Sequence, residues 1–361
     1  MVRISGSTSG AYLAYPYNMH AKAKSTNNYA EPLVSVVTPV YNGADYLAEC
    51  MESVLAQTYS SWEYIIVNNH STDRTLEIAE EYAEKDRRIR LYSNDSLLPV
   101  IANHNRAFGL ISKTSKYCKV VCADDWIFPE CLSRMVDVAE ENPNVGIVGS
   151  YQLSGNGPDW RAWRIRWAEL PYPSRVVKGQ YLCRLQLLGG PYVFGSPTSL
   201  LYRSDLVRAQ AEFFPNSTPL ADMSACYNSL VDTDFGFVHQ VLSYERIHEQ
   251  TMSAVARSLN SYEPATLSDL VTYGPKYLTQ EELSNRVEEV LDGYYRFLAV
   301  SVFHFRDKEF WTYHKERMAE CGHSFSSVRL AKALAMKSLD LLFNPKATVE
   351  KLVRRIRSSR T

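Results

Sequence analysis

The chain has 361 residues, enough to bury a substantial core in one large domain or in two smaller ones. Its hydrophobic share of 45% and charged share of 22% are those of a folded protein, which excludes a disordered chain. The formal net charge of -1 gives no electrostatic reason to expect nucleic acid as a partner.

The seven cysteines are scattered without a CxxC pair, which indicates reduced thiols in a reducing compartment and no zinc cluster. The longest apolar runs, such as residues 33–40, are far too short to cross a bilayer. Residues before Pro32 are rich in Ser, Gly, Asn and Tyr and lack the apolar segment of a signal peptide. We therefore expect a cytoplasmic protein that begins with a loose tail.

Regular structure is predicted from residue 33 onward. The predicted strands are residues 33–38, 63–67, 89–92, 118–122 and 145–149. The predicted helices between them cover about residues 47–55, 76–82, 105–111 and 130–140, and residues 71–73 supply N-cap side chains to the second of these. Because strand and helix patterns alternate without hairpin signals, we predict an α/β fold with a doubly wound, mostly parallel sheet flanked by helices.

The second half of the chain has a different pattern. Between residues 151 and 253 few clean strands are predicted, and beyond that the pattern is helical. Thr279 and Glu282 form a capping-box motif ahead of a long amphipathic segment. Residues 327–361 alternate apolar with basic side chains, and Asn344-Pro345 interrupts them. A helical C-terminal extension is therefore expected.

Polar clusters follow three of the predicted strands, at residues 39–42, 68–73 and 124–125. Open parallel sheets bind ligands beyond the carboxyl ends of their strands. The chain contains neither a glycine-rich dinucleotide fingerprint nor a P-loop, so phosphates need another counter-charge. The adjacent carboxylates Asp124 and Asp125 suit a hard divalent cation, which can hold a diphosphate.

Two runs of sequence carry a resemblance to a known family. The run VSVVTPVYNGADYLAECMESVLAQTYSSWEYIIVNNHSTDRT, followed by VVCADDWIFPE, resembles the family-two glycosyltransferases, which have the GT-A fold. The resemblance extends over about residues 33–253. It implies transfer of a sugar, with inversion, from a nucleotide-diphosphate donor to a hydroxyl of a glycan or lipid-linked saccharide. It also implies a divalent cation, Mg²⁺ or Mn²⁺.

The same resemblance implies roles for individual residues. Asp222 is the expected catalytic base, and Asp124, Asp125 and His248 are the expected metal ligands. His104 stands where the family often has an Arg, which suggests a phosphate contact. The expected nucleotide-sugar site comprises Thr38, Pro39, Tyr41, Asn69, His104, Asp124, Asp125, Arg246 and His248.

Two departures from the family pattern affect these expectations. Residues 68–73 read Asn-Asn-His-Ser-Thr-Asp where the family has Asp-Asp-Gly-Ser-x-Asp, so the base preference is expected to differ. Cys122 replaces the first Asp of the Asp-x-Asp-Asp motif, so donor affinity is expected to change. Two alternatives stay open: a nucleotidyltransferase that makes an activated sugar, and a non-catalytic nucleotide-sugar-binding protein.

The expected parts are a tail (1–31), a nucleotide-sugar-binding half (32–150), an acceptor-binding half (151–255) and a helical extension (256–361). Other interpretations compete at several sites. Asp124 and Asp125 could cap a helix, His248 could be structural, and Asp232 or Asp234 could replace Asp222 as the base. Trp160, Trp163 and Trp167 recur at helical spacing, typical either of core packing or of a sugar- or lipid-phosphate-binding surface. The basic C-terminus is either a solvated helix or a peripheral membrane contact.

Overall fold

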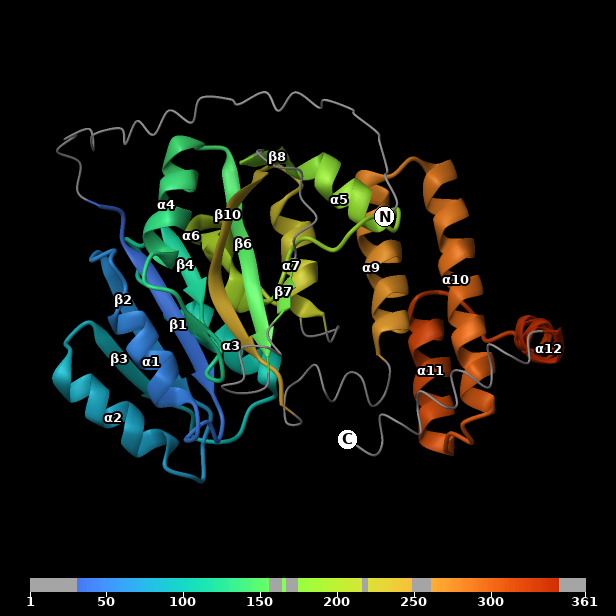
Figure 1. Ribbon diagram of the computed structural model, residues 1–361, viewed down its shortest axis with the longest axis horizontal. Coiled ribbons are helices and arrows are strands. Elements are labelled where there is room, and N and C mark those ends of the chain that lie inside the picture. The colour runs from blue at the N-terminus through green and yellow to red at the C-terminus, as the bar shows by residue number, and fades with distance from the viewer. Residues whose placement is uncertain (1–30, 156–163, 167–174, 216–219, 249–260, 344–361) are drawn as a thin grey trace, which may run out of the picture. The chain divides into compact units, whose positions relative to one another are not determined.

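The computed structural model describes residues 31–155, 164–166, 175–215, 220–248 and 261–343. In these ranges a central sheet is flanked by helices and followed by C-terminal helices (Figure 1). The strands are β1 (Val34–Val40), β2 (Trp62–Asn68), β3 (Ile89–Ser93), β4 (Tyr117–Val120), β5 (Trp126–Ile127), β6 (Val145–Gly155), β7 (Arg164–Arg166), β8 (Val176–Lys178), β9 (Leu200–Arg203) and β10 (Asp234–Arg246). The helices are α1 (Leu47–Leu55), α2 (Thr75–Lys85), α3 (Val100–Gly109), α4 (Cys131–Glu141), α5 (Gly179–Leu187), the 3-10 turn η2 (Pro197–Ser199), α6 (Ser204–Arg208), α7 (Ala221–Ser229), α9 (Tyr262–Tyr277), α10 (Gln280–Val302), α11 (Lys308–Glu320) and α12 (Ser327–Phe343).

The described strands form one sheet in the order β3-β2-β1-β4-β9-β6-β10-β5. The first four are parallel, with Val37 of β1 opposite Ile65 of β2 and Val120 of β4. β9 runs antiparallel to both β4 and β6, and β10 runs parallel to β6. The prediction of a mostly parallel α/β sheet is confirmed.

Two features between residues 151 and 253 contradict the sequence pattern. β10 is a strand of 13 residues where few clean strands were expected. Its register against β6 shifts near Val238 and Val241, and such irregularities disrupt the alternation by which a strand is recognised. Residues 164–166 form strand β7, which pairs with β6, so this stretch is not helical as the spacing of the tryptophans had suggested. Trp160, Trp163 and Trp167 themselves lie outside the described residues.

Both faces of the sheet are covered. Val36 and Val37 are neighbours on β1 and fully buried, yet they belong to different hydrophobic clusters. Side chains alternate between the two faces of a strand, so each face of β1 requires its own helical layer. Met51 of α1 packs in the cluster of Val36, and Phe108 of α3 packs in that of Val37.

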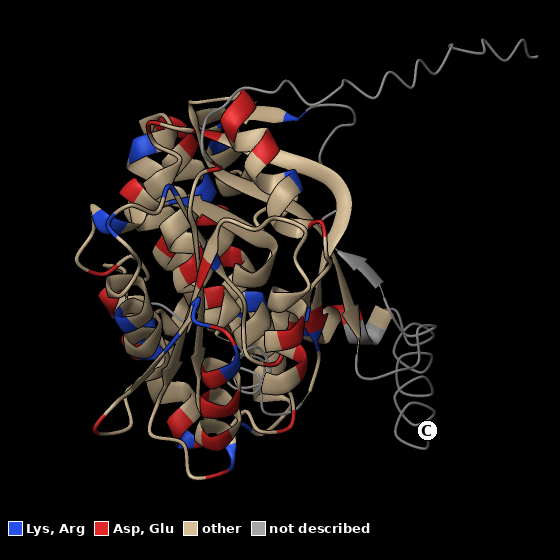
Figure 2. Ribbon diagram, turned by 90° about the vertical axis from the view of Figure 1, so that its left-hand side faces the viewer, with Lys and Arg blue, Asp and Glu red and all other residues tan. Residues whose placement is uncertain are grey.

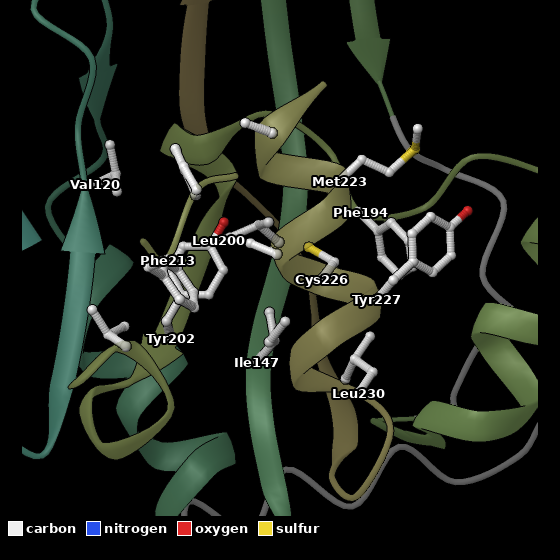
Figure 3. Close-up of a cluster of buried hydrophobic side chains, with 14 of the residues drawn as sticks. Val120, Ile147, Phe194, Leu200, Tyr202, Phe213, Met223, Cys226, Tyr227 and Leu230 are labelled. Carbon is white, nitrogen blue, oxygen red and sulfur yellow. The ribbon is translucent and has the colours of Figure 1, made fainter. Parts of the chain in front are cut away.

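Helix α7 packs in the hydrophobic cluster that contains Val37. Figure 3 shows Met223, Cys226 and Tyr227 of α7 and, just after this helix, Leu230, with Phe194 next to Tyr227. The rings of Phe194 and Tyr227 meet edge to face, with centroids 5.6 Å apart, an arrangement that aromatic pairs favour. This packing fixes the position of the first turn of α7, where Asp222 lies.

The C-terminal helices α9, α10 and α11 stand on the right of Figure 1, away from β1, β2 and β3 on the left. The predicted capping box of α10 is confirmed, because the Thr279 hydroxyl accepts from the backbone N–H of Glu282 and the Glu282 carboxylate accepts from that of Thr279. Leu270 and Tyr273 of α9 join the same cluster as Val37, so this helix shares the core of the sheet. None of the described helices is long and apolar enough to cross a bilayer.

Charged residues are mixed over the described part of the chain. Basic and acidic positions are interspersed along the ribbon in Figure 2, in keeping with the near-zero net charge. Some of them pair, as Arg74 does with Glu77 and Lys116 with Glu140. Exposed pairs of this kind contribute only about 0–1 kcal/mol each.

Candidate active site

The loops after β1 and β2 are joined by hydrogen bonds at the carboxyl edge of the sheet. Asn42 has a positive φ of 47°, and its side-chain oxygen accepts from the backbone N–H of Thr72 (2.8 Å). The backbone N–H of Gly43 donates to the hydroxyl of Thr75 (2.8 Å). Tyr41 stands exposed at this junction, with 47% of its surface accessible. The two loops therefore form one unit, with an accessible aromatic ring at its tip.

Thr38 and Pro39, expected at the base site, are both buried within β1. The Thr38 hydroxyl donates to the backbone carbonyl of Val121 (2.7 Å) and lies 3.0 Å from the hydroxyl of Tyr64. Thr38 thereby ties β1 to the chain immediately before Cys122. The placement of these two residues at the base site stays a prediction.

Asn69 is buried and fully engaged in holding the loop after β3. Its side-chain oxygen accepts from the backbone N–H of Leu98 (2.9 Å) and from the side-chain amide of Asn94 (2.7 Å). Its own amide donates to the carbonyl of Leu98 (2.9 Å). An amide can complete this pattern because it both donates and accepts.

His104 lies on α3, with one ring nitrogen 2.9 Å from the carbonyl oxygen of Val100. Its ring stacks on Phe214 with centroids 5.7 Å apart. Burial lowers the pKa of His104, although the charge of Asp124 acts in the opposite direction. The imidazole is therefore neutral at pH 7, and it offers a hydrogen bond rather than a charge.

Asp124 and His248 meet where the chain leaves β4 and β10. The Nε2 atom of His248 lies 2.9 Å from the Oδ2 atom of Asp124, and both side chains are half-buried. The Sγ of Cys122 and carboxylate oxygens of Asp124 and Asp125 all lie within 4.8 Å of one another. Carboxylate oxygen, imidazole nitrogen and thiolate sulfur are common metal ligands, so these side chains fit a divalent cation.

Asp125 is held from two sides. Its carboxylate accepts from the Thr198 hydroxyl (2.6 Å) and from the backbone N–H of Arg246 (3.0 Å). Burial, followed by the charge of Asp124, raises the pKa of Asp125 well above its usual range. The Thr198 hydroxyl also accepts from the backbone N–H of Cys122 (3.1 Å). Thr198 therefore connects η2 to both ends of the segment from Cys122 to Asp125.

The buried Lys119 supports this connection from β4. Its ammonium group donates to the backbone carbonyls of Thr198 (2.5 Å) and Leu200 (3.1 Å). Burial lowers the pKa of Lys119. Lys119 is not among the residues predicted from the sequence, although a single Lys inside the apolar run of residues 118–122 signals a buried, satisfied ammonium group.

The Arg246 side chain contacts Asp124, Glu49 and Tyr46. Its Nε donates to the carbonyl of Asp124 (3.0 Å), and its Nη2 pairs with the carboxylate of Glu49. The guanidinium also stands over the ring of Tyr46, 4.6 Å from its centroid. No role for Tyr46 or Glu49 is predicted from the sequence, because they resemble the cap and the first turn of an ordinary helix.

Asp222 is half-buried in the first turn of α7. Burial raises its pKa to about 6, against the opposing effect of nearby backbone N–H groups. The charge of Glu245 raises the pKa of both Asp222 and Asp125, so Glu245 lies within electrostatic reach of both sites. Of the alternative bases, Asp234 pairs with Lys178 (2.8 Å) and Asp232 is exposed.

Comparisons with known proteins identify the family that the chain resembles. A profile described as "Glycosyl transferase family 2" matches residues 35–209. An "Uncharacterized glycosyltransferase" of Haemophilus influenzae is 38% identical over 120 residues, which cover 33% of this chain and 36% of the relative. The chain thus spans about a third of the length of the first curated relatives that it matches.

Two solved structures share the fold. The crystal structure of S. aureus TarS 1-349 in complex with UDP-GlcNAc matches with a TM-score of 0.58 and 18% identity, covering 84% of this chain and 87% of that one. A mannosyltransferase from Pyrobaculum calidifontis in complex with GDP-Man and Mn²⁺ matches with a TM-score of 0.50 and 15% identity, covering 88% and 83%. The sheet and its edge site define a GT-A-type α/β protein. Over residues 35–209 the chain is similar to glycosyl transferase family 2.

Proposed function

We propose that the protein transfers a sugar from a nucleotide-diphosphate donor to an acceptor hydroxyl, with inversion and with a divalent cation, Mg²⁺ or Mn²⁺. The observation that carries the proposal is the pairing of Asp124 with His248 beside Cys122 and Asp125. The relatives named as glycosyltransferases and the neighbour that holds Mn²⁺ support it.

On the donor side, Asp124 and His248 would hold the cation directly. Asp125 would hold it through its remaining lone pairs while staying bonded to Thr198 and Arg246. When bound, such a cation neutralises the charge that develops on the leaving diphosphate. Arg246 donates to the backbone carbonyl of Asp124 and so supports the turn that carries its carboxylate.

On the acceptor side, Asp222 would remove the proton from the attacking hydroxyl. A carboxylate with a pKa of about 6 is mostly ionised at pH 7, yet it is a stronger base than an ordinary aspartate. Attack from the face opposite the departing diphosphate inverts the configuration of the anomeric carbon. The acceptor would be a saccharide or a lipid-linked saccharide.

The nucleotide would lie over the loops after β1 and β2. The exposed ring of Tyr41 would stack on the base, while Thr38 and Pro39 would support the loop from within β1. Asn69 would shape the base site through the loop that it holds at Leu98. The neutral His104 would contact a phosphate as a hydrogen-bond partner.

The C-terminal segment would hold the protein at an anionic membrane surface. The described part of α12 exposes Val328, Met336 and Leu339 at helical spacing, whereas Ala333 on its other side is buried. The sequence that follows α12 contains six basic residues and one acidic residue: Lys346, Lys351, Arg354, Arg355, Arg357 and Arg360, with Glu350. Apolar and basic groups together favour peripheral binding.

A panel of nucleotide-diphosphate sugars, tested for thermal shift and for hydrolysis with and without Mn²⁺, examines the proposal. We expect one donor class to stabilise the protein only when metal is present and to be hydrolysed slowly. NMR of the released sugar then reports the configuration of the anomeric carbon. Pyrophosphate release from a nucleoside triphosphate and a sugar phosphate would instead support the nucleotidyltransferase. Donor binding without turnover of any acceptor would support the binding protein.

A further inference from the structure

Cys122 brings a sulfur atom to the acidic site. Its Sγ belongs to the group in which Asp124 and Asp125 supply oxygens, all within 4.8 Å of one another. Within the described ranges, this is the one group of three or more such side chains. Five other cysteines are buried, and Cys321 is half-buried among the C-terminal helices. The sulfur at residue 122 is thus placed where a cation is proposed to bind.

The spacing suits one shared ion. A zinc ion takes sulfur at about 2.3 Å and oxygen or nitrogen at about 2.0–2.2 Å, so ligand atoms at the tetrahedral angle stand roughly 3.5 Å apart. The three donor atoms, all within 4.8 Å of one another, need only a small inward adjustment to reach that separation. His248 lies 2.9 Å from Asp124 but outside this group of mutually close atoms.

The backbone around Cys122 is held in place. The Thr198 hydroxyl accepts from the backbone N–H of Cys122 (3.1 Å), and the Cys50 thiol donates to the Cys122 carbonyl (3.4 Å). Asp125 shares the same Thr198 hydroxyl (2.6 Å). Sulfur and oxygen donors therefore stand on one fixed turn, so the cation does not have to gather them from a flexible loop.

We propose that the thiolate of Cys122 is a direct metal ligand, together with Asp124 and Asp125, and that the site therefore prefers thiophilic Zn²⁺ to Mg²⁺ or Mn²⁺. This inference rests on the proposed metal site. On binding, the sulfur gives up its proton to solvent and a metal–sulfur bond forms. Mg²⁺ favours oxygen ligands, whereas thiolates select softer ions such as Zn²⁺.

Co²⁺ is the probe, because a cobalt–thiolate bond produces a sulfur-to-metal charge-transfer band in the near ultraviolet. Titration of the full chain with Co²⁺ should produce this band, and Zn²⁺ should abolish it by competition. Cys122→Ser should lose the band and bind Zn²⁺ at least about tenfold more weakly, since even second-shell changes weaken metal binding 10–100-fold. Its affinity for Mg²⁺ should change little.

Two controls separate this inference from the proposed function. Cys321→Ser, at another half-buried cysteine, should keep the band. Cys122→Asp should lose the band while binding Mg²⁺ or Mn²⁺ more tightly than the wild type. Co²⁺ binding that needs Asp124 but shows no sulfur band would overturn the thiolate ligand and leave the metal site standing. Co²⁺ binding that is unaffected by Asp124→Asn would overturn both.

Discussion

His248 Nε2 lies 2.9 Å from Asp124 Oδ2, although 124 positions separate the two residues in the chain. The contact exists because β10 pairs antiparallel with β5, with Tyr244 opposite Trp126. That pairing places the chain after β10 alongside the turn after β4. A carboxylate and an imidazole so arranged can share one cation.

Asp124→Asn should abolish metal-dependent donor binding, because it replaces a charged ligand with a neutral amide. In the wild type, affinity for a nucleoside diphosphate should require Mn²⁺ or Mg²⁺ and disappear with EDTA. Isothermal titration with and without metal measures both effects. The control is Glu130→Gln, an exposed carboxylate that pairs with Arg134 away from the site. Equal wild-type affinity with and without metal would contradict the assignment of Asp124 as a ligand.

Asp222→Asn should lower kcat by about 10²–10⁴-fold and leave donor affinity nearly unchanged, because general base catalysis contributes about that much. Asp232→Asn tests the alternative base and should leave kcat unchanged, since Asp232 is exposed close to the end of the same helix. The wild-type rate should fall as pH decreases through about 6, where Asp222 takes up its proton. Wild-type turnover in Asp222→Asn would show that another carboxylate acts as the base.

The same carboxylate should affect the pH dependence of stability. Burial raises its pKa from 3.8 to about 6 on folding, so between these values the native state binds more protons than the unfolded state. This contribution to stability is therefore present at low pH and is lost as pH rises through about 6. Urea unfolding should show that the gain from pH 7 to pH 5 is larger in the wild type than in Asp222→Asn. Identical pH profiles would contradict the raised pKa.

Asn69→Asp should sharpen the preference for bases that present an N–H group, such as uracil or guanine. The wild-type amide is occupied by Asn94 and Leu98, whereas a carboxylate cannot donate to the Leu98 carbonyl, so one of its oxygens becomes free to accept from the base. The change also places a carboxylate oxygen against the carbonyl of Leu98, so it should lower stability by about 1–3 kcal/mol. Competition among nucleoside diphosphates measures the ranking, and urea unfolding measures stability. An unchanged ranking would show that Asn69 does not influence base selection.

Thr198→Val should weaken both stability and metal affinity. It removes the hydroxyl that donates to the buried Asp125, and an unsatisfied buried acceptor costs about 1–3 kcal/mol. Ser199→Ala is the matched control, because its hydroxyl donates only to the carbonyl of Ser196 within the same turn (2.8 Å). Urea unfolding and Mn²⁺ titration measure the two effects. Loss of stability with unchanged Mn²⁺ affinity would show that Thr198 does not support the metal site.

The full chain should co-sediment with anionic vesicles at low salt, and a chain that ends at Phe343 should bind them far less. Each basic residue near an anionic surface contributes about 1 kcal/mol, and this truncation removes six of them. It leaves α12 intact, so the core under Ala333 is preserved. Met336→Gln with Leu339→Gln should weaken binding further, whereas Tyr181→Gln, on the exposed side of α5, should not. Equal sedimentation of all variants would contradict a membrane contact.

Local sequence patterns predict the first half of the fold well. Residues 33–38 already show the β-branched run that becomes β1, and residues 63–67 show β2. Strands buried on both faces are almost continuously apolar, so each can be recognised without knowledge of its partners. The capping box at Thr279 is equally local, because both of its partners lie within one helical turn.

By itself, the sequence determines the α/β class, the helical extension and the order of the polar clusters, since these depend on neighbours within a few residues. It cannot show that Thr198 bonds to Asp125, that Arg246 holds the turn of Asp124, or that His248 reaches its carboxylate. Those contacts join segments about 70 to 125 residues apart. Only the pairing of β10 with β5 and β6, and of β9 with β4, brings them together, because such register depends on the packing of the whole sheet rather than on any one strand.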